Sequence, residues 1–208
     1  MRKPKHFKEI VAVLDKYFPD PQIPLDFLDP YTLLIAVVLS AQCTDKRVNE
    51  VMPELLKYGT TPDRIAALGI EKVTEIIKPC GLYKRKAPAI IKISEILRDT
   101  YGGKVPCERE ALESLPNVGR KTANVVLSHA FGIPAFPVDT HILRLSARWG
   151  WSSGKTANAV EEDLCQLFAP EEWMRRHLQL ILFGRTYCKA TGHKPEDCPA
   201  CACLIEKR

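Results

Sequence analysis

The most informative stretch of the sequence is Leu115-Pro116-Asn117-Val118-Gly119-Arg120-Lys121-Thr122, which lies between two segments of helical periodicity. Pro116 starts a turn, and Asn117 and Gly119 are residue types that tolerate positive φ angles. The next helix therefore begins at a tight hairpin with its first backbone N–H groups pointing outward. Such a helix start binds a phosphate through these groups and the helix dipole, without reading any base. Taken alone, the stretch could equally be an ordinary turn between two helices.

Helical periodicity extends over most of the 208 residues. Apolar residues from Phe7 to Phe18 recur every three or four positions, as they do on the buried face of a helix. Asp29 and Thr44 are placed to cap two further helices. No segment alternates polar and apolar residues as a strand does, so the sequence predicts an all-α fold. The predicted helices cover residues 7–18, 30–40, 45–58, 62–68, 71–78, 84–101, 109–114, 121–131, 140–150, 156–168 and 171–188.

The composition, 46% hydrophobic and 26% charged, is that of a folded globular protein and excludes a disordered chain or a coiled coil. The longest uncharged run, residues 122–138, is shorter than the roughly 20 residues that span a bilayer. The charged N-terminus is not followed by the apolar segment of a signal peptide. We therefore expect a soluble, cytoplasmic protein.

Basic residues are concentrated in one window of the chain. The net charge is +5, and residues 115–160 contribute +4 of it, with Asp139 as their one acidic residue. A second basic run is Lys84-Arg85-Lys86. Such runs most often mark a solvated surface, and by themselves they give only a mild indication of a polyanionic partner. The basic residues of the window are Arg120, Lys121, Arg144, Arg148 and Lys155.

Two further motifs accompany the hairpin, namely Leu39-Ser40-Ala41-Gln42-Cys43-Thr44-Asp45 before it and Pro137-Val138-Asp139-Thr140-His141-Ile142-Leu143-Arg144 after it. With these motifs in this order, the chain from about Leu33 to Tyr187 resembles the endonuclease III family of helix-hairpin-helix DNA glycosylases. The resemblance implies an all-α protein of two lobes, with DNA held in a groove between them and one base flipped out. Residues 24–132 would form a six-helix bundle carrying the hairpin, and residues 1–23 and 133–208 a second helical lobe.

The resemblance also implies roles for particular residues of this chain. Lys121 matches the lyase lysine of the family, and Asp139 matches its essential aspartate. Gln42 and Leu82 match the residues that fill the gap left by the flipped base. The family usually has Gly at position 117, and since Asn is common in left-handed conformations we expect the hairpin to be kept. The further contacts with DNA are assigned to Asn117, Val118, Gly119, Arg120 and His141.

A lysine amine suits both base removal and strand cleavage. Its Schiff base with the sugar C1′ acidifies the neighbouring carbon for β-elimination, whereas a water nucleophile removes the base without cutting the strand. Since only about one lysine in 2,500 is neutral at pH 7, we expect desolvation on DNA to activate Lys121. Asp139 is then assigned to proton handling and to stabilising positive charge on the sugar. The simpler alternatives are a solvated lysine at 121, an N-cap at 139, a helix-end amide at 42 and a core leucine at 82.

Three functions are compatible with the sequence. The favoured one is a bifunctional DNA N-glycosylase of base excision repair that removes oxidised pyrimidines and cleaves the abasic site by β-elimination. The second is an adenine-mispair glycosylase without lyase activity, against which Lys121 argues. The third is a non-enzymic DNA-docking module, which would not require the pair of Lys121 and Asp139. The expected partner is double-stranded DNA with damaged or abasic sites, bound by a monomer without any membrane contact.

Four of the eight cysteines lie within the last 21 residues, namely Cys188, Cys198, Cys201 and Cys203. Without a secretion signal, such a cluster indicates a metal site rather than disulfides. The family pattern has gaps of six, two and five residues between four cysteines that hold a four-iron, four-sulfur (4Fe-4S) cluster. Here the gaps are nine, two and one, and Cys203 departs most from the pattern.

The resemblance therefore favours a 4Fe-4S cluster on the four cysteines, in a structural role. A second possibility is a zinc ion bound by Cys188, His193, Cys198 and Cys201, whose spacing suits a Cys3His site. The third is a tail that packs without metal.

Overall fold

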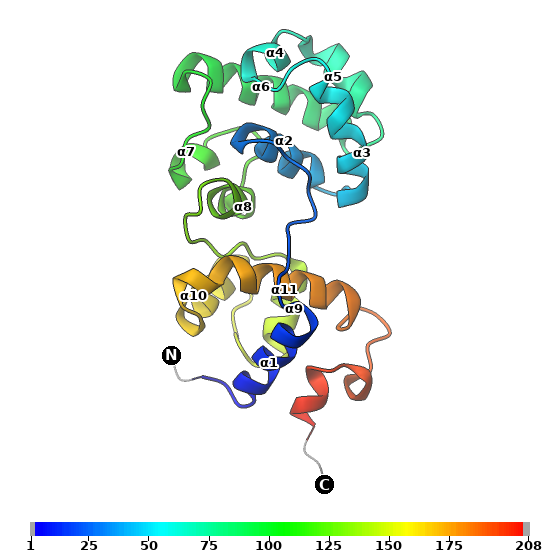
Figure 1. The fold of residues 1–208 in the computed structure, drawn as a ribbon, viewed down its shortest axis with the longest axis vertical. Helices are drawn as coiled ribbons and strands as arrows, with labels where there is room; N and C mark the ends of the chain where they lie inside the picture. The colour runs from blue at the N-terminus through cyan, green and yellow to red at the C-terminus, as the bar shows by residue number, and fades with distance from the viewer. Residues whose placement is uncertain (1–2, 206–208) are drawn as a thin grey trace. The chain divides into compact units, whose positions relative to one another are not determined.

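The computed structural model describes residues 3–205, and every regular element in that range is helical, which confirms the all-α prediction (Figure 1). The chain forms two compact units. Unit 2 spans Pro24–Ile133, and unit 1 combines the chain on both sides of it. Among the described helices, none has the length and apolar character needed to cross a membrane.

Unit 2 is organised around a buried central helix, α2. All its residues from Tyr31 to Leu39 are buried, as expected from a sequence that is apolar on every side. Helix α2 packs against α3, α6 and α8, and α6 runs along α4 and α5 (Figure 1). The helices of this unit are α2 (Pro30–Ser40), α3 (Asp45–Leu56), α4 (Pro62–Ala66), α5 (Gly69–Ile77), α6 (Tyr83–Tyr101), α7 (Arg109–Glu113) and α8 (Arg120–Ala130).

The two predicted caps are confirmed. Asp29 Oδ1 accepts a hydrogen bond from the Thr32 N–H at 2.8 Å, and the Thr32 hydroxyl oxygen accepts one from the Asp29 N–H at 2.9 Å. This reciprocal capping box satisfies two backbone donors that the helix itself leaves unpaired. The Thr44 hydroxyl oxygen accepts from the Arg47 N–H at 3.2 Å. These local bonds explain why α2 and α3 begin where they do.

Unit 1 has an aromatic core. Trp149 and Trp151 lie with their ring centroids 4.9 Å apart, and Phe183 packs against Trp149 at 5.7 Å. The predicted stripe of the first helix contributes Ile10 and Leu14, both fully buried. The elements of this unit are α1 (Phe7–Tyr17), α9 (Thr140–Arg148), α10 (Ala157–Leu167), η1 (Pro170–Glu172), α11 (Trp173–Thr186), η2 (Pro195–Asp197) and η3 (Cys201–Leu204).

The tail after α11 belongs to this core. Cys188, Cys198 and Cys201 are buried within the same apolar cluster as the tryptophans. Two short 3-10 turns, η2 and η3, shape the tail, and η3 contacts α1. The periodicity of the sequence did not predict these turns, because each is only one turn long.

Candidate active site and metal centre

In the hairpin before α8, one residue has a left-handed backbone conformation. Asn117 has φ 59°, as expected, and its Nδ2 donates to the Arg85 carbonyl at 3.4 Å. Gly119, by contrast, is extended with φ −99° and serves as the N-cap of α8. Val118 donates its N–H to the Leu115 carbonyl at 3.1 Å, and its side chain is buried. Both groups thus contribute to the hairpin itself.

The beginning of α8 is open beside Gly119. Its φ angle is one that any residue adopts, and an added Cβ would meet no protein atom within 4 Å. The fold itself therefore does not require glycine here, and its missing side chain exposes the backbone at the helix start. Lys121 is an exposed residue in the first turn of α8, directly after the half-buried Arg120.

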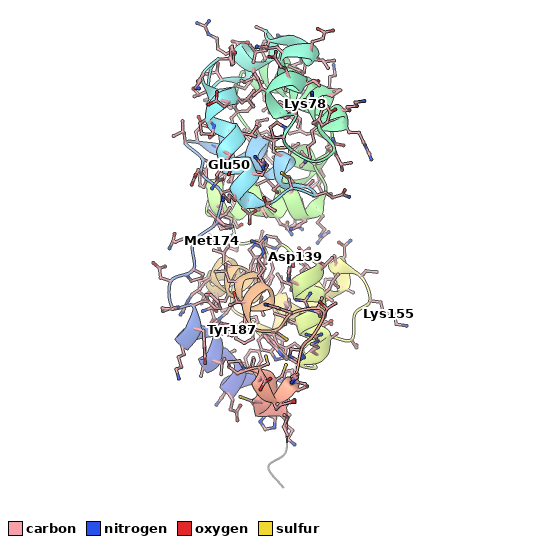
Figure 2. All side chains as sticks on the ribbon, turned by 90° about the vertical axis from the view of Figure 1, so that its right-hand side faces the viewer. Glu50, Lys78, Asp139, Lys155, Met174 and Tyr187 are labelled. Carbon is pink, nitrogen blue, oxygen red and sulfur yellow. The ribbon has the colours of Figure 1, made fainter. Side chains whose placement is uncertain are left out.

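Asp139 is the N-cap of α9 (Figure 2). Its Oδ1 accepts hydrogen bonds from the backbone N–H groups of His141 at 2.8 Å and Ile142 at 3.0 Å. The simpler capping role is thus real, and it holds a half-buried carboxylate in one orientation. The capping bonds are compatible with an additional catalytic role.

His141 lies in the first turn of α9 and faces α11. Its Nδ1 is 3.1 Å from Arg144 Nη2, which also donates to the Gly184 carbonyl at 2.9 Å. Partial burial lowers the pKa of the His141 imidazole, which favours the neutral ring. His141 is therefore half-buried against α11 within unit 1.

Gln42 and Leu82, predicted as base-gap residues, lie on neighbouring turns of unit 2. Both have left-handed backbones, with φ 52° and 58°, and both are exposed, Leu82 to 43%. This exposure excludes the core role for Leu82. The two turns approach each other closely at Gly81. A Cβ at this position would lie only 2.5 Å from the Gln42 carbonyl oxygen, so only glycine fits there without a shift of the backbone.

We predict that Gly81→Ala lowers the free energy of unfolding by about 1–3 kcal/mol, because the added methyl group forces the two turns apart. Denaturant unfolding measures the effect. Gly119→Ala is the matched control, since its Cβ enters open space at a permitted φ angle. Only the poorer N-cap propensity of alanine opposes it, so its cost should stay below about 1 kcal/mol. Equal stability of both variants would contradict the close approach of the turns.

Three of the basic residues noted in the sequence have structural roles. Lys86 is buried and donates to the Leu39 carbonyl at 2.8 Å, and this burial lowers its pKa. Arg144 donates to the Cys188 carbonyl at 3.0 Å, and Arg148 donates to the Lys189 carbonyl at 2.8 Å. The charge of the window therefore overstates the basic surface available to DNA.

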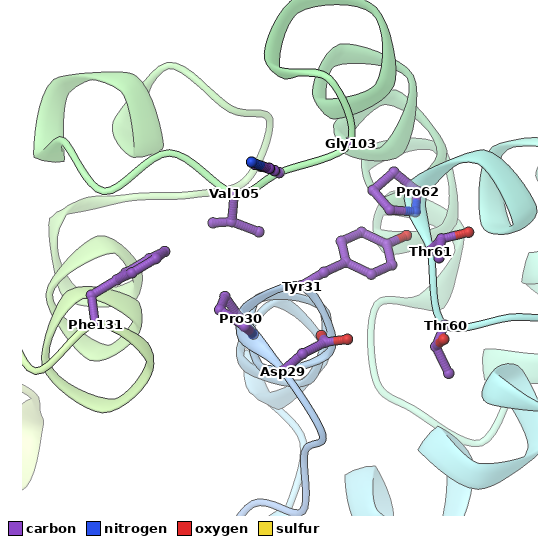
Figure 3. Close-up of a pocket in the computed structure, with 10 residues that line it drawn as sticks. Asp29, Pro30, Tyr31, Thr60, Thr61, Pro62, Gly103, Val105 and Phe131 are labelled. Carbon is purple, nitrogen blue, oxygen red and sulfur yellow. The ribbon is translucent and has the colours of Figure 1, made fainter.

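A pocket of about 360 Å³ lies beside the N-terminus of α2 (Figure 3). Its wall includes Tyr31, whose hydroxyl is hydrogen-bonded to that of Ser94 at 2.6 Å, and Phe131. None of the predicted site residues lines it. We therefore do not assign this pocket to base recognition.

The tail gathers four potential metal ligands, which we call the C-terminal Cys/His group: Cys188, His193, Cys198 and Cys201. Their ligand atoms all lie within 4.8 Å of one another. This is the Cys3His combination weighed from the sequence. Cys203 is not among them, and its Sγ contacts the Pro199 carbonyl at 3.4 Å.

Two donors outside this group point at its sulfur atoms. Arg148 Nη1 lies 3.2 Å from Cys188 Sγ, and the Trp149 indole N–H donates to Cys201 Sγ at 3.4 Å. Sequence reasoning missed both, because these contacts join residues separated by 40 and 52 positions. The sequence offered only a weak indication of these contacts: a predicted helix ends near Arg148 and Trp149, and four cysteines lie close to the C-terminus.

Comparisons with known proteins agree with the motifs. Residues 35–170 match the HhH-GPD superfamily of base excision DNA repair proteins. Endonuclease III of Escherichia coli K12 is 46% identical over 99% of this chain and 95% of its own, and that of Bacillus subtilis 43% over 93% and 90%. An endonuclease III trapped as a covalent intermediate with DNA, in an estranged-adenine complex, superposes with a TM-score of 0.90 at 42% identity, covering 96% of this chain and 94% of its own. With its hairpin, its Asp-capped α9 and this similarity over nearly its whole length, the chain belongs to the endonuclease III family.

Proposed function

We propose that the protein is a bifunctional DNA glycosylase and abasic-site lyase of base excision repair, acting on oxidised pyrimidines. The observation that carries this proposal is the position of Lys121, an exposed residue in the first turn of α8 that directly follows the hairpin. The similarity to an endonuclease III that was trapped covalently on DNA supports an enzyme that bonds to its substrate.

In this proposal the neutral amine of Lys121 attacks C1′ of the damaged nucleotide. A C1′–N bond forms and the bond to the base breaks, so the base leaves with the bonding electrons and takes up a proton. The C1′–O4′ bond of the sugar ring then breaks as the nitrogen loses a proton and O4′ gains one, which gives the Schiff base. This Schiff base acidifies C2′, and loss of a C2′ proton breaks the C3′–O3′ bond and expels the 3′ phosphate by β-elimination. Water then hydrolyses the imine and releases Lys121.

Asp139 is proposed to handle protons and to stabilise the positive charge that develops on the sugar. The two backbone bonds to its Oδ1 support this role, because a carboxylate that is already oriented needs no reorganisation during the reaction. The same cap position thus serves both the helix and the chemistry.

DNA is proposed to approach the open helix start at Gly119, where backbone N–H groups and Arg120 meet a phosphate. Gln42 and Leu82 are proposed to enter the space left by the flipped base. Their exposure on two adjoining turns suits a wedge, since such side chains replace stacking that the duplex loses. For Asn117, Val118 and His141 the DNA contacts implied by the resemblance remain predictions.

We predict that binding to abasic DNA weakens steeply between low and physiological salt, because phosphate contacts release counterions. Arg120→Gln should reduce the slope of log affinity against log salt by about 1. Gly119→Ala should lower affinity without changing the slope, because it blocks the backbone and removes no charge. Fluorescence anisotropy measures both variants, and a salt-independent affinity of the wild-type protein would contradict the phosphate contacts.

The test of the proposed function is borohydride trapping on abasic duplex DNA. A lyase that works through an amine gives a covalent protein–DNA product and a nicked strand. An adenine-mispair glycosylase would release adenine from a mispaired duplex and give no nick, and a docking module would bind without either product. Either of the last two outcomes would overturn the proposal.

The C-terminal Cys/His group is proposed to bind metal in a structural role. Its three cysteines lie within the apolar core of unit 1, and a bound ion would link the two ends of the loop that runs from residue 188 to 201. The 4Fe-4S cluster implied by the family resemblance would take thiolates from several of these cysteines and stabilise the tail.

A further inference from the structure

We propose that Cys188, His193, Cys198 and Cys201 bind one zinc ion in place of the 4Fe-4S cluster that the family resemblance implies. This inference deepens the metal-binding part of the proposed function and is independent of the lyase chemistry. It is drawn from the positions of the ligand atoms, the identity of the fourth ligand and the donors around the sulfur atoms.

The separations between ligand atoms match one tetrahedral ion. Two thiolates bound to zinc at about 2.3 Å lie about 3.8 Å apart, and a bound thiolate and imidazole about 3.6 Å. Here Cys188 Sγ is 3.7 Å from Cys201 Sγ and 3.4 Å from His193 Nε2. Cys198 Sγ completes the set, because all four ligand atoms lie within 4.8 Å of one another.

The same separations do not fit a 4Fe-4S cluster. Its four ligands bind four different irons at separate corners of a cube, so their sulfur atoms point outward and lie much farther apart than two ligands of one ion. Cys203, which that cluster would need as its fourth thiolate, contacts the Pro199 carbonyl instead. The one-residue gap between Cys201 and Cys203 leaves little chain for reaching another corner.

The local backbone arranges Cys198 and Cys201 as a pair. The Ala202 N–H donates to the Cys198 carbonyl at 2.8 Å, which closes a tight turn that includes Pro199, Ala200 and Cys201. Cys-x2-Cys turns of this kind are typical of structural zinc sites. The nine-residue gap after Cys188, in turn, gives the chain enough length to bring His193 to the group.

The surroundings are also suited to a zinc site with one net negative charge. Three thiolates and one neutral imidazole exceed the charge of Zn²⁺ by one. Arg148 Nη1, 3.2 Å from Cys188 Sγ, supplies a positive charge, and the Trp149 indole N–H supplies a hydrogen bond to Cys201 Sγ. Donors of this kind orient metal ligands and tune their basicity, and they come from the helix end that packs on the tail.

The deciding experiment is metal and sulfide analysis of the full-length protein purified without air, together with its visible absorption spectrum. We expect about one zinc per chain, no iron, no acid-labile sulfide and a colourless solution. Replacement of zinc by Co²⁺ should give the intense visible bands of a tetrahedral thiolate site. Brown protein with iron and sulfide, or protein free of metal, would overturn the inference.

Two variants with opposite expected outcomes sharpen the test. His193→Gln should lower zinc affinity by at least about 10- to 100-fold in a chelator competition, since even outer-shell changes cost that much. Cys203→Ser should leave zinc content unchanged. If the four cysteines instead held a cluster, Cys203→Ser would lose metal and His193→Gln would keep it. Because the readout is metal content, a negative result here is separable from a failure of borohydride trapping.

Discussion

Lys121→Gln is expected to abolish the borohydride-trapped complex and to reduce cleavage of abasic DNA to the uncatalysed level. The amide nitrogen of glutamine is not a nucleophile towards C1′, so no Schiff base forms and C2′ is not acidified. Binding should persist with a slightly smaller salt dependence, because one cation near the phosphates is lost. Gel analysis after reduction and anisotropy on the same duplex measure the two effects.

Two further variants separate chemistry from charge. Lys121→Arg keeps the positive charge but cannot supply a neutral amine, so it should bind normally and also fail to trap. Lys92→Gln is the control, because it replaces an exposed lysine of α6 that is paired with Glu95. It should trap and cleave abasic DNA as the wild-type protein does. If Lys121→Gln cleaved abasic DNA at the wild-type rate, the Schiff base would belong to another residue.

The helices were predictable because their signals are local. The stripe from Phe7 to Leu14 needs only the helical period, and Asp29 needs only Thr32, three residues away. The same holds for Asp139, whose capping partners are two and three residues distant. Fold class and helix starts therefore follow from short-range physical chemistry.

Charged side chains were predicted poorly because their partners are distant in the sequence. Lys86 binds a carbonyl 47 positions away, and Arg144 binds carbonyls 40 and 44 positions away. A count of charges treats these residues as solvated, although burial against a carbonyl removes them from the DNA-binding surface. The choice between His193 and Cys203 as fourth ligand likewise depends on the path of the tail, and spacing alone left it open.

Asp139→Asn is expected to slow base removal by about 10²- to 10⁴-fold, the usual contribution of a positioned proton-transfer group. Asparagine keeps an oxygen that can accept the N–H groups of His141 and Ile142, and it is as good an N-cap as aspartate. The melting temperature should therefore barely change. Single-turnover base release and thermal unfolding of the same preparation measure the two quantities.

The matched variants decide whether Asp139 acts as a cap alone. Asp139→Ala loses both cap and charge, so it should cost about 0.5–2 kcal/mol of stability in addition to the loss of rate. Asp29→Asn is the control, because it makes the same change at the N-cap of α2. It should leave the rate of base removal unchanged. A normal rate in Asp139→Asn, together with destabilisation only in Asp139→Ala, would restrict Asp139 to capping. A slow but stable Asp139→Asn would assign the lost rate to the missing carboxylate, because the hydrogen bonds of the cap are still made.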